Sequence, residues 1–146
     1  MERLNTVINM RTLENNTNKD LDFINLLHFI KNEEDIDAVT ELIADNASLN
    51  NFFADKSMKF LLRAVIGIIY EVLPPEELNW SNVFGFIKLD KYENKIGKSM
   101  FDELFEDFGN KYPKSYAYKQ YKAFRATPTE PRNRIVTQTL EKISKW

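Results

Sequence analysis

The sequence predicts an all-α fold, a single compact helical domain of about six helices. Apolar residues recur every three or four positions through most of the chain, which is the spacing of one helix face. Asn or Ser residues, which cap helix N-termini, stand before several of these stretches. The alternating pattern of a half-buried strand is missing beyond one short stretch near the N-terminus.

The N-terminal 22 residues are expected to form an irregular lead-in rather than a core of their own. Residues 7–10 have the composition of a short strand, and a polar, Asn-rich loop follows them. The all-α domain is expected over residues 23–146. Its first long helix should span residues 33–45, because Asn32 can cap it and acidic residues fill its first turn.

The longest helix is predicted for residues 52–73, with Asn51 as its N-cap. It is apolar nearly all round, which is typical of a helix buried by neighbours on several sides. Gly67 in its middle indicates a close approach of another helix. Pro74 and Pro75 should end it, since the residue before a proline is disfavoured in the helical region.

Two shorter helices are expected next. The first starts at Asn79 or Ser81 and reaches about Leu89, and a polar loop follows it. The second has Ser99 as its N-cap and should stop at Gly109, because glycine is the usual residue just after a helix.

Two C-terminal helices complete the predicted fold. Pro113 can occupy the first turn of a helix that reaches Arg125. The stretch from Thr127 to Glu130 has the pattern of a capping box and should open a last helix to about Ser144.

Composition excludes many kinds of catalytic site. The chain has no cysteine and one histidine, so disulfides, thiolate nucleophiles and multi-histidine metal sites are excluded. We expect His28 to be a partly buried structural residue and the acidic residues in 102–107 to form a solvated face. Gly97-Lys98-Ser99 resembles the end of a phosphate loop, but Tyr92 stands where that loop needs glycine. We therefore expect no catalytic residue, no metal and no cofactor.

The charge of the chain is divided unevenly. Residues 111–146 hold nine Lys or Arg and two acidic residues, a net charge of +7, whereas residues 1–110 carry −9. This division indicates either a basic surface for an acidic partner or two oppositely charged halves that pack on each other.

A helix over residues 113–125 would carry two stripes of side chains. The stripe expected to face the core holds Ala117, Tyr121 and Phe124. The outward stripe holds Lys114, Tyr118, Lys122 and Arg125. Lysines can neutralise phosphates and an aromatic ring can stack on a base, so these residues, with Lys119, Arg132 and Arg134, are candidate contacts for substrate or nucleic acid. The alternative is a solvated basic face whose lysines pair with acidic helices.

Four blocks occur in a recognisable order. They are residues 51–56 (Asn-Phe-Phe-Ala-Asp-Lys), 74–80 (Pro-Pro-Glu-Glu-Leu-Asn-Trp), 101–105 (Phe-Asp-Glu-Leu-Phe) and 118–124 (Tyr-Lys-Gln-Tyr-Lys-Ala-Phe). Over residues 21–143, this order resembles the all-α domain of type IV secretion coupling proteins, the TraG/TraD-like conjugation ATPases. The chain departs from the family pattern at residues 126–131, where the family usually shows Gly-Lys-Thr.

The resemblance implies a specific role. Coupling proteins are membrane-anchored hexameric motors that pass relaxase–DNA substrates to a secretion channel in bacterial conjugation and plasmid mobilisation, and their all-α domain lies at the cytosolic mouth of the ring. The resemblance thus implies a cytoplasmic, substrate-receiving domain, excised from its motor and without ATPase activity or membrane contact of its own. Its partners would be a relaxase or relaxosome protein, weakly bound DNA, the motor domain and hexamer neighbours. The alternative is a small stand-alone helical DNA-binding or regulatory protein.

Overall fold

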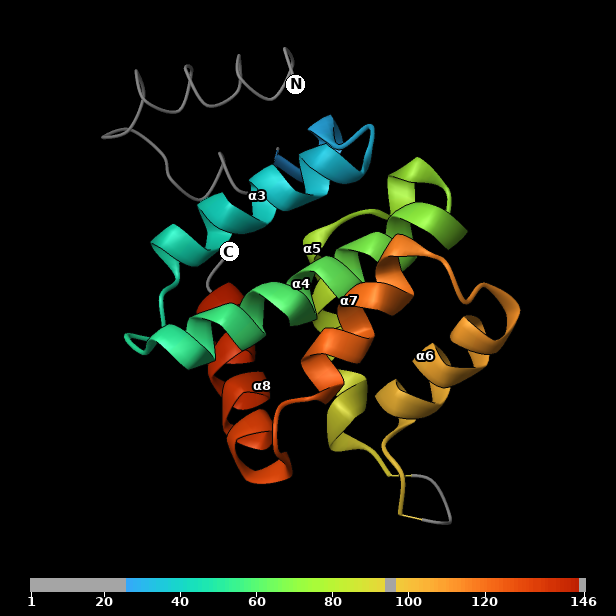
Figure 1. Cartoon of the computed structure of the whole chain (residues 1–146). Helices are drawn as coiled ribbons and strands as arrows, with labels where there is room; N and C mark the ends of the chain where they lie inside the picture. The colour runs from blue at the N-terminus through green and yellow to red at the C-terminus, as the bar shows by residue number, and fades with distance from the viewer. Residues whose placement is uncertain (1–25, 94–96, 145–146) are drawn as a thin grey trace.

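The computed structural model describes residues 26–93 and 97–144. This part of the chain folds into six α-helices, with one isolated β-bridge between Glu93 and Ser99 and no strand (Figure 1). The prediction of an all-α fold is therefore confirmed. The expected lead-in over residues 1–22, with its strand at residues 7–10, lies outside the described residues.

The helices are α3 (Glu33–Asn46), α4 (Phe52–Val72), α5 (Trp80–Lys88), α6 (Met100–Lys111), α7 (Tyr116–Arg125) and α8 (Thr129–Ile143). Single 3-10 turns lie at Leu27–Phe29, Pro75–Glu77 and Leu89–Lys91. Figure 1 shows α4 running across the molecule, with α3 along one side and α7 and α8 along the other. None of the described helices is both long enough and apolar enough to cross a bilayer.

Helix α4 is the centre of the core, as its apolar sequence predicts. It contacts α3, α5, α7 and α8. Its middle is buried almost completely, and Ile66 has no exposed surface. The predicted close approach at Gly67 is confirmed, because a Cβ atom there would lie 3.1 Å from the ring of Tyr116 and 3.2 Å from Cβ of Ala117. Helices α4 and α7 are therefore packed as closely as a residue without a side chain allows.

Side-chain caps begin most of the helices. Each cap oxygen accepts a hydrogen bond from the backbone N–H three residues later, as it does at Asn32, Asn51, Asn79, Ser99 and Ser115. The predicted caps Asn32, Asn51 and Ser99 are thus confirmed, and Asn79 rather than Ser81 begins α5. These caps satisfy backbone donors that have no partner inside the helix.

Predicted boundaries between α6 and α7 are wrong at two places. Gly109 does not end α6, which continues to Lys111. Gly109 instead lies under the ring of Tyr118, where any Cβ atom would collide with that ring. Pro113 is in the turn before α7 rather than in its first turn, because Ser115 is the N-cap.

The predicted capping box before α8 and the predicted burial of His28 are also wrong. The hydroxyl of Thr127 does not cap α8 but forms a hydrogen bond of 2.9 Å with the hydroxyl of Ser57 on α4. Pro128 is the N-cap residue and gives no side-chain hydrogen bond. His28 is exposed on its 3-10 turn, while the neighbouring Leu27 occupies the core.

Candidate substrate-contact face

Helix α7 is anchored in the core by the predicted inward stripe. Ala117, Tyr121 and Phe124 have no exposed surface, which confirms their assignment to the core. The ring of Tyr121 stacks on that of Phe105 of α6, with a centroid separation of 4.9 Å and an interplanar angle of 10°. Aromatic packing of this kind fixes the rotation of α7 about its axis, and so determines which residues face outward.

Four cations form what we call the basic face: Lys114, Lys119, Lys122 and Arg125. All four are exposed. Within residues 26–93 and 97–144, none of them forms an ion pair with a carboxylate. Lys122 Nζ lies 5.1 Å from the ring centroid of Tyr118, and the guanidinium of Arg125 lies 5.7 Å from that of Tyr121. The charges of the basic face are thus unneutralised by the described protein and are accessible.

Tyr118 is less available than the outward stripe predicted. Its side chain is half-buried, with the ring against Gly109 of α6 and stacked on Tyr121 at a centroid separation of 6.1 Å. Because Lys122 also lies over this ring, Tyr118 is chiefly part of the α6–α7 packing. To contact Tyr118, a nucleic-acid base would have to displace Lys122 or approach the edge of the Tyr118 ring.

Arg132 does not belong to the exposed set, since its side chain is only 10% exposed. Its guanidinium Nη2 lies 2.6 Å from Asp90 Oδ1 and 2.8 Å from Asp102 Oδ1. The guanidinium carbon also lies 5.0 Å from the ring centroid of Phe124, and the hydroxyl of Tyr121 donates to Asp102 Oδ1 at 2.8 Å. We call Asp90, Asp102, Tyr121 and Arg132 the buried polar cluster. Arg132 therefore ties α8 to α6, and its side chain is not presented on the exposed surface.

The acid–base properties of this cluster follow from its burial and its pairing. Burial raises the pKa of Asp90, and the nearby Arg132 offsets only part of that effect. Burial acts in the same direction on Asp102, but the hydrogen bonds from Arg132 and Tyr121 outweigh it and lower the pKa of Asp102. Burial raises the pKa of the Tyr121 phenol, and its hydrogen bond to Asp102 raises it further.

Arg134, the last predicted contact residue, lies on another part of the surface. It is exposed on α8, where its guanidinium is 4.0 Å from Glu130 one turn earlier. Arg134 lines a groove next to the start of α4, whereas the basic face is on α7 and the turn before it.

Among the described residues, few ion pairs join the acidic part of the sequence to the basic part. Among the described cations after position 110, Arg132 alone pairs with carboxylates from the earlier part of the chain. The acidic stretch of α6 is also not simply solvated as predicted, because Asp102 joins the buried polar cluster and Glu106 pairs with Lys98 at 2.7 Å. In the part of the chain that the structure describes, no three acidic or histidine side chains gather as metal ligands.

Two exposed aromatic residues were not identified as functional candidates from the sequence. Phe52 and Phe53, in the first turn of α4, are 76% and 77% exposed, and their rings contact each other edge to face. The sequence does indicate their exposure, because both lie away from the apolar helix face that continues through Met58 and Leu62. Both side chains are therefore accessible to a partner outside the described protein.

Comparisons of this chain with protein-family models, with curated proteins and with solved structures find no match.

Proposed function

We propose that this chain is a non-catalytic, substrate-receiving domain of a conjugative type IV secretion coupling protein, and that its basic face contacts relaxase-bound DNA. The observation that carries the proposal is the set of four exposed cations, presented by α7 and the turn before it, that form no ion pair within the described residues. Cations in such an arrangement neutralise phosphates and release the counterions that surround them, which supplies most of the affinity for DNA of any sequence.

The resemblance to coupling proteins supports the proposal in a second way. The last of the four sequence blocks that resemble this family, residues 118–124, forms most of α7. In this block, Tyr121 and Phe124 are explained by core packing. Lys119 and Lys122 are exposed and form no ion pair within the described residues, although Lys122 also lies over the ring of Tyr118. Two exposed lysines that the core does not require are accounted for by a contact outside the domain.

A stand-alone DNA-binding or regulatory protein remains the competing function, because the same basic face favours it. The two functions differ in the affinity they require of the isolated chain. A domain taken from a hexameric ring loses the avidity of its neighbours, so it should bind DNA weakly, with a Kd of about 10⁻⁴–10⁻⁶ M. A stand-alone specific binder should reach about 10⁻⁸ M or tighter.

The test is fluorescence anisotropy of a labelled single-stranded oligonucleotide with the purified chain, over a series of salt concentrations. The variant Lys119→Glu/Lys122→Glu should bind much more weakly than the parent. The matched control, Lys31→Glu/Lys88→Glu, changes the net charge equally at two exposed lysines outside the basic face and should retain most of the binding. An equal loss of DNA affinity in both variants would show a general charge effect and contradict the proposal. A pull-down with the relaxase of the same mobile element, on the same variants, tests the protein contact.

A further inference from the structure

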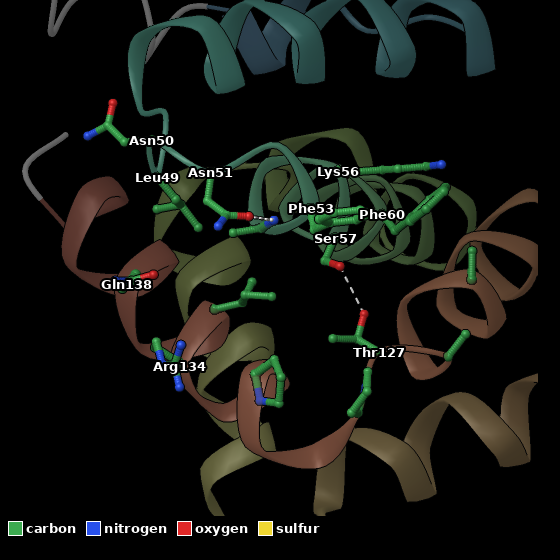
Figure 2. A pocket seen from close by; sticks show the side chains of 16 residues that line it. Leu49, Asn50, Asn51, Phe53, Lys56, Ser57, Phe60, Thr127, Arg134 and Gln138 are labelled. Atoms are coloured by element: carbon green, nitrogen blue, oxygen red, sulfur yellow. Dashed lines mark hydrogen bonds between the residues drawn. The ribbon is translucent and has the colours of Figure 1, made fainter.

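A groove lies between the start of α4, the α7–α8 turn and the first half of α8 (Figure 2). Its volume is about 680 Å³, which is enough for a few side chains but not for a folded domain. The apolar part of its lining includes Phe53, Phe60, Pro131 and Ile135, which come from both helices. The groove is thus a preformed apolar site between elements that are far apart in the sequence.

The walls of the groove are held in place by contacts within the protein. The hydroxyls of Ser57 and Thr127 form a hydrogen bond of 2.9 Å that joins α4 to the α7–α8 turn, as Figure 2 shows. Pro128 and Pro131 restrict the backbone on the α8 side, since proline fixes φ. A ligand would therefore meet a groove that needs little rearrangement to receive it.

The charge of the groove has one sign. Among the described residues, its charged lining residues are Lys56 and Arg134, and no described carboxylate lines it. Within the described residues Lys56 forms no ion pair, and Arg134 has only the contact of 4.0 Å to a highly exposed Glu130. The carboxylate of Asp55 is engaged elsewhere, because it accepts hydrogen bonds from Ser48 and from the backbone of Leu49. The groove is therefore complementary to a negatively charged ligand.

A large apolar side chain, Phe53, borders the groove. Its side chain is 77% exposed at the edge of the groove, so the protein keeps a large apolar ring in water. Exposed aromatic residues beside an apolar hollow are a usual feature of protein-binding sites.

We propose that this groove binds a short segment of a partner protein in which one or two large apolar side chains are flanked by Asp or Glu. The apolar side chains would occupy the hollow beside Phe53 and Phe60, and the carboxylates would pair with Lys56 and Arg134. A nucleic acid fits this site less well than it fits the basic face, because the lining is mostly apolar and offers two cations. The proposal does not depend on DNA binding by α7.

The experiment selects peptides from a phage-displayed random library of about 12 residues against the immobilised chain. The enriched peptides should combine aromatic or aliphatic residues with Asp or Glu. One of them, synthesised with a fluorescent label, should bind the parent chain, and its affinity should fall about tenfold or more in Phe53→Ser and in Lys56→Glu/Arg134→Glu. Enrichment of no peptide, or of peptides without acidic residues, would overturn the proposal.

Matched variants separate a specific effect from a general one. Val72→Ser removes another exposed apolar side chain, at the other end of α4. Lys31→Glu/Lys88→Glu makes the same charge change away from the groove. Both should keep the affinity of the parent within about twofold. The basic-face variant Lys119→Glu/Lys122→Glu should also bind the peptide, even where it no longer binds DNA. Loss of peptide binding there, with retention in the groove variants, would place the peptide on α7 and overturn the proposal. Thermal unfolding of each variant checks that it is folded.

Discussion

The guanidinium of Arg132 and the carboxylate of Asp102 meet at 2.8 Å, which joins α8 to the first turn of α6. Asp90 shares the same guanidinium nitrogen at 2.6 Å, and the side chains of all three residues are at most 18% exposed. One cation thus compensates two carboxylates in the interior, and the position of α8 depends on it.

Loss of this cation should destabilise the protein strongly. Arg132→Ala leaves two buried carboxylates without their partner, which costs about 3–5 kcal/mol in the free energy of unfolding. Arg134→Ala, two positions later on the same helix, removes an exposed arginine and should change it by less than about 0.5 kcal/mol. Urea denaturation followed by circular dichroism measures both. Similar midpoints for the two variants would contradict the role assigned to Arg132.

The stability of the protein should fall at alkaline pH because of Tyr121. Its pKa is raised in the folded state, by burial and by the hydrogen bond to Asp102, above the value of about 10 for an unfolded chain. The folded state therefore holds this proton more tightly, so its contribution is complete below about pH 10 and is lost as the pH rises further. Urea midpoints measured from about pH 9 to pH 11 should fall less steeply in Tyr121→Phe than in the parent. Parallel curves would show that Tyr121 ionises as freely in the fold as outside it.

Two glycines in helices should respond in opposite ways to replacement by alanine. Gly109→Ala places a methyl group where the ring of Tyr118 lies, so it should cost about 1–3 kcal/mol. Gly85→Ala meets open space in α5 and should stabilise the protein by about 0.5–1 kcal/mol, because alanine is the better helix former. Thermal unfolding distinguishes the two variants. The double variant Gly109→Ala/Tyr118→Ala should lose less stability than the two single variants lose together. Strictly additive losses in the free energy of unfolding would contradict the contact.

The middle of α4 should tolerate no charge. Ile66→Asp would bury an unpaired carboxylate at a position with no exposed surface, at a cost of several kcal/mol, which is comparable with the total stability of a typical domain. Val72→Asp, on the same helix but 56% exposed, should fold normally. Soluble expression and cooperative melting test both, and a well-folded Ile66→Asp protein would show that α4 is not the centre of the core.

The salt dependence of DNA binding should report the number of cations in contact. For single-stranded DNA, the slope of log K against log salt is about −0.7 for each neutralised phosphate. Replacing Lys119 and Lys122 by glutamine should therefore make the slope shallower by about 1.4 if both contact phosphates. An unchanged slope would mean that neither Lys119 nor Lys122 contacts the phosphates of the DNA.

Local signals in the sequence identified the fold and the starts of most helices. Each of the caps Asn32, Asn51 and Ser99 bonds to the backbone only three residues later, so its role can be predicted without knowledge of the tertiary structure. The errors arose where a tertiary contact overrides the local pattern. Gly109 lies inside α6, where Tyr118 of another helix covers it. The hydroxyl of Thr127 forms a hydrogen bond with that of Ser57 on α4 and does not cap α8.

The candidate site was predictable to the extent that helical spacing determines exposure. The spacing identified Ala117, Tyr121 and Phe124 as the buried stripe of α7, as the structure confirms. The same spacing indicates that Arg132 is buried, because Arg132 lies three residues before the buried Ile135 and shares its helix face. The groove, in contrast, joins α4 to α8, and no local pattern reveals a contact between segments so far apart in the chain.

The close packing of Gly67 against Tyr116 and Ala117 affects how the two proposed surfaces can communicate. Helix α7 carries most of the basic face on one side, while its Ala123 and the C-cap residue Ala126 line the groove on another. With the ring of Tyr116 and Cβ of Ala117 packed directly on Gly67, α7 has little room to slide or rotate against α4 by small steps. Occupancy of one surface should accordingly leave the intrinsic affinity of the other unchanged, apart from long-range charge effects that added salt removes. The domain would then act as a rigid two-sided adaptor, on which two ligands are held at a fixed separation and orientation.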